Sequence, residues 1–114
     1  MKLEKCSNCG MCKSICPVFK VLLEETTSAR GKANLIKKDV LDEVYYVCSL
    51  CGTCKINCPA GIDLPEEIRK MREKMVEIKA ETKANKKMIK NIREHGNPYG
   101  KVEEGRIPKD LYCC

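Results

Sequence analysis

Eight cysteines of this 114-residue chain form two runs with the same spacing, C-x2-C-x2-C-x3-C-P. The first run contains Cys6, Cys9, Cys12 and Cys16, and the second contains Cys48, Cys51, Cys54 and Cys58. Three cysteines two residues apart can surround one iron–sulfur cube, while the fourth, followed by proline, points elsewhere. The spacing therefore predicts thiolate ligands for two 4Fe–4S clusters, a chemistry of single-electron exchange.

The two runs are copies of one ligand loop. Residues 6–17 and 48–59 are identical at eight of twelve positions, 42 residues apart. In two-cluster ferredoxins the fourth cysteine of each run ligates the other cluster. The predicted ligand sets are therefore crossed: Cys6, Cys9, Cys12 and Cys58 for cluster one, and Cys48, Cys51, Cys54 and Cys16 for cluster two. Such crossing would join the two halves of the chain, so that metal binding supplies folding energy.

Zinc knuckles and disulfides are the alternatives for these cysteines. Structural zinc usually takes two well-separated C-x2-C pairs, which two unbroken four-cysteine runs match poorly. Disulfides belong to oxidising compartments. Met1–Lys5 leads to Cys6 with no apolar segment or cleavage site, which predicts a cytoplasmic protein. No run reaches the ~20 apolar residues of a membrane span, so we expect no membrane insertion.

The formal net charge of +6 first suggests nucleic-acid binding. Each 4Fe–4S core with four thiolates carries about two negative charges, so two clusters would offset about four of the six. We therefore expect a weakly basic protein that binds no nucleic acid. The basic residues between 69 and 90 either form a solvated face or dock an acidic partner.

The segments around the cysteine runs are helical in pattern and show no alternation typical of strands, which predicts an all-α fold. Between the runs, Thr26, Thr27 and Ser28 offer N-caps for a helix over residues 29–38. Asp42 is a candidate cap for a short helix over residues 43–47.

The clearest predicted helix follows Asp63, where Glu66 completes a capping-box pattern and Pro65 lies in the first turn. Its apolar stripe is Ile68, Met71, Met75, Ile78 and Thr82. A second helical stretch carries Met88, Ile89 and Ile92 and ends at Gly96. We expect Met71, Met75 and Met88 in the core and not as ligands.

By length the chain is one domain, and a core this small needs the clusters as staples. We expect residues 1–95 to form the domain and residues 96–114, rich in glycine and proline, to form an extended linker or tail. Tyr45 and Tyr46 are expected beside the second cluster. Arg30 either pairs with a carboxylate or approaches a cluster.

Three further segments are similar to those of a known family. They are the Ser28–Lys32 stretch SARGK, the exit from the second run over Cys58–Glu73, and the Gly96–Gly100 stretch GNPYG with Arg106 beyond. The chain resembles the N-terminal iron–sulfur module of heterodisulfide reductase subunits, glycolate and lactate oxidase iron–sulfur subunits and anaerobic glycerol-3-phosphate dehydrogenase. The resemblance implies the α-helical ferredoxin fold, which succinate dehydrogenase iron–sulfur subunits share more distantly.

The resemblance also implies a function: relaying single electrons through two 4Fe–4S clusters between a flavoprotein, or another redox subunit, and a terminal acceptor site. The sequence contains no catalytic constellation, so a substrate site would belong to another component of the oxidoreductase. A freely diffusing ferredoxin and a cluster-based redox sensor are the alternatives.

Many members of that family continue into a domain with paired cysteines of the CCG type, whereas this sequence stops at Cys113 and Cys114. It is either a stand-alone subunit, for which a CCG-domain subunit is a candidate partner, or a fragment. The terminal pair consists either of exposed thiols without a cluster role or of redox-active or ligating thiols.

Overall fold

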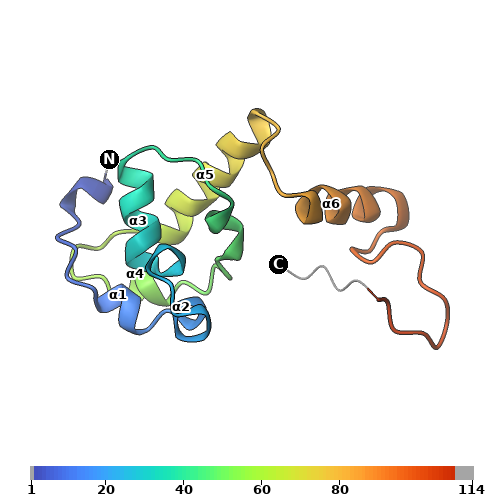
Figure 1. Cartoon of the computed structure of the whole chain (residues 1–114), viewed down its shortest axis with the longest axis horizontal. Helices are drawn as coiled ribbons and strands as arrows, with labels where there is room; N and C mark the ends of the chain where they lie inside the picture. The colour runs from blue at the N-terminus through green and yellow to red at the C-terminus, as the bar shows by residue number, and fades with distance from the viewer. Residues whose placement is uncertain (1, 110–114) are drawn as a thin grey trace.

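The computed structural model describes residues 2–109 of the chain. Its elements in order are η1 (Lys2–Lys5), α1 (Met11–Ser14), α2 (Pro17–Leu22), η2 (Glu25–Thr27), α3 (Ala29–Lys37), η3 (Glu43–Val47), α4 (Thr53–Ile56), α5 (Leu64–Glu77) and α6 (Lys83–His95). Residues 2–109 contain helices and no strand (Figure 1), so the predicted all-α class is confirmed. None of the helices described is long and apolar enough to cross a membrane.

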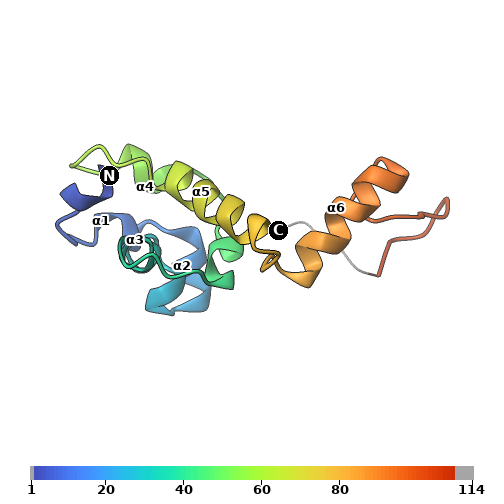
Figure 2. The same cartoon turned by 90° about the horizontal axis from the view of Figure 1, so that it is seen from above.

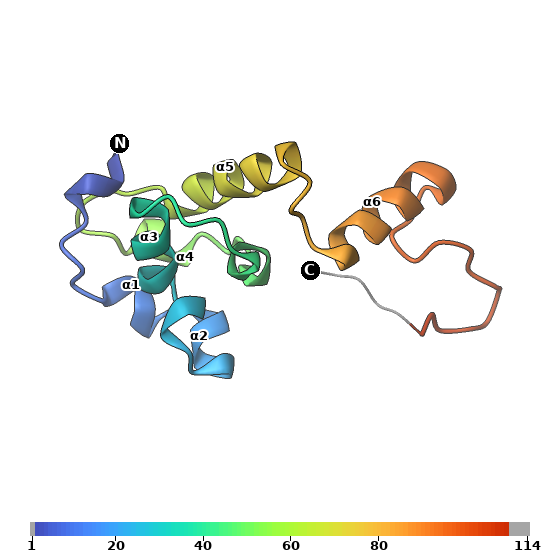
Figure 3. The ribbon, with the colours of Figure 1, turned by 45° about the horizontal axis from the view of Figure 1, so that its top comes forward.

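Helix α3 contacts η1, η2, α1 and α5, and α4 contacts α1 and α5. Figures 1 and 2 show α6 beyond the end of α5, away from the other helices. In Figure 3 the short helices α1 and α2 lie on one side of α3, and η3 lies near α5. The cysteine runs and the core therefore belong to one body, from which α6 extends.

The core of that body is small. Its buried apolar residues are Leu3, Ala29, Ala33, Ile36, Val44, Tyr45, Ile62, Leu64, Ile68, Met71 and Met75. Six half-buried cysteines pack against it: Cys6, Cys12, Cys16, Cys48, Cys54 and Cys58. Most of the predicted ligands are thus part of the wall of the core.

Helix α3 begins as the sequence predicts, because the Ser28 hydroxyl oxygen accepts a hydrogen bond from the Gly31 N–H at 2.9 Å. Gly31 allows a close approach of the preceding turn: a Cβ at this position would lie 1.9 Å from the carbonyl oxygen of Glu25. The short helix η3 also begins as predicted, with Asp42 accepting from the Val44 N–H at 2.8 Å. These local contacts fix the starts of two helices, α3 and η3, in the connection between the cysteine runs.

Helix α5 is capped by Asp63, which accepts a hydrogen bond from the Glu66 N–H at 3.3 Å. The predicted stripe is buried as far as Met75, but its continuation through Ile78 and Thr82 is wrong. The helix ends at Glu77, and Ile78 is 60% exposed. The chain turns away at Lys79, whose φ of 58° is left-handed and breaks the helical backbone.

Helix α6 begins at Thr82, which caps it by accepting from the Asn85 N–H, and ends at Gly96 as predicted. No residue of α6 is buried, so the prediction that Met88 lies in the core is wrong. The physical reason is that α6 extends away from the body (Figure 1), and no other helix within residues 2–109 packs closely over it.

The segment after α6 first folds back onto it. The Asn91 side-chain amide donates to the carbonyl oxygen of Pro98 at 2.9 Å, and Asn97 donates to that of Gly100 at 3.1 Å. Residues 101–109 contain no helix. Cys113 and Cys114, for which the sequence left two interpretations, lie outside the described residues.

Candidate cluster-binding sites

The two cysteine runs adopt the same local backbone. In each run the residue before the second cysteine is left-handed, Asn8 at φ 60° and Leu50 at φ 54°. The residue after that cysteine is a left-handed glycine, Gly10 at φ 83° and Gly52 at φ 78°, which starts the short helix α1 or α4. A bulky residue such as Leu50 rarely adopts positive φ, and such strain typically persists at functional sites.

Because α1 contacts α4, the loops of the two runs meet. Two cavities lie at this junction, of about 340 and 320 Å³ with their open mouths included. Cys6, Cys9, Cys12 and Cys58 line the first, and Cys16, Cys48, Cys51 and Cys54 line the second. Each cavity thus brings together three cysteines of one run with the fourth of the other, the grouping of the predicted crossed sets. Ligation by these residues stays a prediction.

The donor set of both cavities fits a 4Fe–4S cluster. Each presents four sulfurs and contains no histidine or carboxylate among its lining residues. Thiolates are the ligands that iron–sulfur clusters require. Among residues 2–109, no three histidine, cysteine or acidic side chains are arranged to hold a single metal ion.

A third, apolar cavity lies between the two cysteine sets. Its lining includes Cys6, Cys12 and Cys58 of the first set, Cys54 of the second, and core residues such as Leu3 and Ile62. Burial, with the nearby Cys48 and Cys12, raises the pKa of the Cys54 thiol to about 11. Burial, followed by Cys6 and Cys9, raises the pKa of Cys12 as well. Burial and crowding therefore disfavour the thiolate form of these cysteines, and bound iron would favour it by its positive charge.

The second cysteine of each run is more exposed than the other three. Cys9 and Cys51 are exposed, whereas the other six cysteines of the two runs are half-buried. The Thr53 hydroxyl lies 3.4 Å from the Cys51 sulfur and is the main cause of a lowered pKa at that thiol. One edge of each cysteine set therefore faces outward, where an electron can enter or leave.

The sequence left two positions open for Arg30, beside a carboxylate or beside a cluster, and the structure shows Arg30 in contact with a carboxylate and at a candidate cluster site. Its Nε donates to Glu25 at 2.8 Å, and its side chain lines the first cavity. Glu25 also pairs with Lys13 at 2.6 Å, and hydrogen bonds from both cations lower the pKa of its carboxyl to about 2.

Sequence reasoning missed Lys32, a buried cation that the SARGK segment contains. Its side chain is 1% exposed and donates to the carbonyl oxygen of Thr27. Burial lowers the pKa of Lys32, while Cys48 and Cys16 of the second set act in the opposite direction. In the sequence, only its position in the SARGK motif indicated that Lys32 could matter, and a motif does not show where a side chain points.

Sequence reasoning also missed Arg72 in α5, which donates to the carbonyl oxygens of Tyr45 and Cys48. The ring of Tyr46 lies 5.3 Å from its guanidinium carbon. Neither tyrosine lines the second cavity: Tyr45 is fully buried in the core and donates to Val40 at 2.5 Å.

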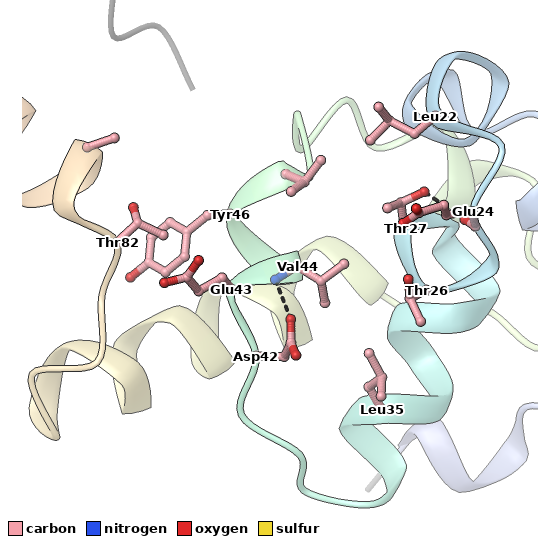
Figure 4. A pocket seen from close by; sticks show the side chains of 12 residues that line it. Leu22, Glu24, Thr26, Thr27, Leu35, Asp42, Glu43, Val44, Tyr46 and Thr82 are labelled. Carbon is pink, nitrogen blue, oxygen red and sulfur yellow. Dashed lines mark hydrogen bonds between the residues drawn. The ribbon is translucent and has the colours of Figure 1, made fainter.

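The widest hollow described lies away from the cysteines, between η2, η3 and the start of α6 (Figure 4). Leu35, Val44, Tyr46 and Thr82 are among its lining residues, and Glu24, Asp42 and Glu43 add acidic side chains. It contains no cysteine, so it is separate from the two candidate sites.

In comparison with known protein families, residues 2–62 match a family described as a 4Fe-4S dicluster domain. The matched segment is more than half of the chain and includes both cysteine runs. No curated protein matches the chain.

Proposed function

The chain belongs to the 4Fe-4S dicluster domain family, and from that premise we propose that it relays single electrons within an oxidoreductase, between a flavoprotein and a terminal acceptor site. The iron–sulfur electron-transfer role follows from the family. The donor and acceptor classes rest on the resemblance to heterodisulfide reductase-like and 2-hydroxy acid dehydrogenase-like iron–sulfur subunits.

The residues proposed to hold the first cluster are Cys6, Cys9, Cys12 and Cys58, and those for the second are Cys48, Cys51, Cys54 and Cys16. A 4Fe–4S cluster, when bound, supplies one-electron oxidation and reduction with little change in its surroundings. The chain's own contribution is to hold eight sulfurs in two adjoining sets.

The observation that carries the proposal is the apolar cavity shared by the two sets. Cys12 and Cys54 both line it, together with Ala33, Ile62 and Leu64. These apolar side chains make the space between the sites less polar than water, which lowers the cost of solvent rearrangement when a charge moves. An enzyme that acted on a substrate at one cluster would not need two sites joined in this way.

Helix α6, which extends from the body of the protein, supports membership of a complex. Helix α6 carries basic residues and a partly exposed apolar face that includes Ile92, 46% exposed. A flavoprotein, another redox subunit or a CCG-domain subunit is the proposed partner. The eight cysteines within residues 2–109 form no disulfide, which suits a reducing compartment, for which we propose the cytoplasm.

Anaerobic purification with iron and sulfide counted per chain tests the cluster content. We expect about eight irons, and electron paramagnetic resonance of the dithionite-reduced protein should show two spin-coupled clusters. About two zinc ions per chain and no visible chromophore would overturn the assignment. The partner is tested separately, by recovering a tagged chain from its native cells and assaying the complex for flavin. Recovery without any flavin-containing chain would contradict the proposed donor.

A further inference from the structure

The two candidate sites are built by one repeated sequence, yet their surroundings differ at matched positions. Thr53 in the second run corresponds to Met11 in the first, 42 residues earlier. The Thr53 hydroxyl is 3.4 Å from the sulfur of Cys51, whereas a methionine at the matching place offers no hydrogen-bond donor. Hydrogen bonds to cluster sulfurs are among the features that set reduction potential.

A second difference is the buried ammonium of Lys32. Its side chain is buried on α3, and the charges of Cys48, Cys16 and Cys54, all members of the second set, oppose the lowering of its pKa by burial. Its one hydrogen bond is to the carbonyl oxygen of Thr27, and within residues 2–109 it forms no ion pair with a carboxylate. Its side chain is therefore shielded from water and has no acidic partner among the ion pairs described, so a positive charge on it would act through a low effective dielectric constant.

The first site also has cations nearby, but they are exposed to solvent or share a carboxylate. The exposed Lys37 donates to the carbonyl oxygen of Cys6 at 2.9 Å. Arg30 and Lys13 share the carboxylate of Glu25, and their side chains are 30% and 29% exposed. Interactions of partly exposed charges are weakened by water and salt, whereas a buried charge acts through a lower effective dielectric constant. The nearby positive charge therefore acts more strongly on the second site than on the first.

We propose that Lys32 and Thr53 make the second site, formed by Cys48, Cys51, Cys54 and Cys16, the more easily reduced of the two. Reduction adds one negative charge, which a buried ammonium and a hydroxyl donor both stabilise. This inference rests on the proposed function, because it requires both clusters to be bound. Because the second site is the more easily reduced, it takes the first electron, and electron transfer between the two sites has a direction.

The test is a dithionite titration of the holo-protein, monitored by electron paramagnetic resonance, with iron and sulfide counted in every sample. Lys32→Met removes the charge at similar length, and Thr53→Val removes the hydroxyl at similar volume. Both variants should lower the higher of the two reduction potentials and leave the lower one unchanged. Met11→Thr should raise the lower potential. Lys38→Met, the same charge change at an exposed position after α3, should move neither.

Two results would overturn the inference while the protein still holds its full iron: a fall in the lower potential, or no shift in Lys32→Met and Thr53→Val. If Lys32→Met fails to retain iron, Thr53→Val and Met11→Thr decide by the same criteria. A wild-type protein without iron would instead overturn the proposed function, and this inference with it.

Discussion

Arg72 of α5 donates two hydrogen bonds to the carbonyl oxygen of Tyr45, 27 residues earlier, at 3.0 and 2.7 Å. The same guanidinium reaches the carbonyl oxygen of Cys48 at 2.6 Å. Planar donors of this kind suit several acceptors at once. One side chain therefore fixes the entry of the second cysteine run against the long helix that follows that run.

Replacing Arg72 by methionine should destabilise the protein and loosen the second site. Hydrogen bonds from a charged donor contribute about 1.5–3 kcal/mol, and the carbonyls of Tyr45 and Cys48 would lose theirs. The measurement is the free energy of unfolding in denaturant, under anaerobic conditions. Arg69→Met is the matched control, because Arg69 is on the same helix, is 59% exposed and pairs only with Glu66 among the ion pairs described. Its loss should cost less than about 1 kcal/mol, and equal losses would contradict the assigned role of Arg72.

Gly31→Ala should destabilise the protein although alanine is normally the better helix former by about 1 kcal/mol. The added methyl group would lie 1.9 Å from the carbonyl oxygen of Glu25, so η2 would have to move away from α3. Backbone displacement of this kind typically costs about 1–3 kcal/mol. The check is the midpoint of chemical unfolding. An unchanged or raised midpoint would mean that the turn before α3 can move freely.

Tyr45 should make the stability depend on pH in the alkaline range. Burial, followed by the charges of Asp42 and Asp39, raises the pKa of its phenol to about 12, above the value of about 10 for an unfolded chain. A raised pKa stabilises the fold fully below pH 10, and that contribution is lost as the pH rises through 12. Tyr45→Phe should cost about 1 kcal/mol at pH 8, through the lost bond to Val40. The difference in unfolding free energy between the two proteins should shrink between pH 10 and 12, and a constant difference would contradict this prediction.

The crossed assignment predicts which cysteine variants resemble one another. Cys58→Ala should leave the same residual spectrum as Cys6→Ala, although Cys58 belongs to the second run. Cys16→Ala should in turn resemble Cys48→Ala. Electron paramagnetic resonance of the four reduced proteins, with iron counted per chain, makes the comparison. Pairing by run, with Cys58→Ala resembling Cys48→Ala, would show that the sets are not crossed.

Removal of the iron should unfold the body of the protein. Six of the eight cysteines in the two runs pack against the small core. Loss of the clusters would leave these polar thiols crowded together, with nothing to fill the space between them. Treatment with an iron chelator and reductant should reduce the helical circular dichroism signal, and reconstitution should restore it. A chelated protein that keeps its full helical signal would show that the core folds without metal.

Features set by neighbouring residues could be predicted from the sequence. The caps at Ser28, Asp42 and Asp63 and the end of α6 at Gly96 depend on contacts within a few residues, and all four were confirmed. Where α5 ends was not predictable from its stripe, because Ile78 continues the apolar period while the backbone turns at Lys79. The position of Met88 was misjudged for a related reason, since a periodic pattern does not show whether anything covers the helix.

The sequence by itself indicated iron–sulfur chemistry, because the repeated spacing of the cysteines predicts thiolate ligands without reference to the fold. Only the tertiary structure decided which cysteines share a cavity and which cations lie near them. The proposed influence of Lys32 is on cysteines 16 or more positions away in the chain, and Arg72 bonds to residues 24 and 27 positions earlier. Such contacts depend on how α3 and α5 pack, and long-range packing is not encoded in the spacing of neighbouring residues.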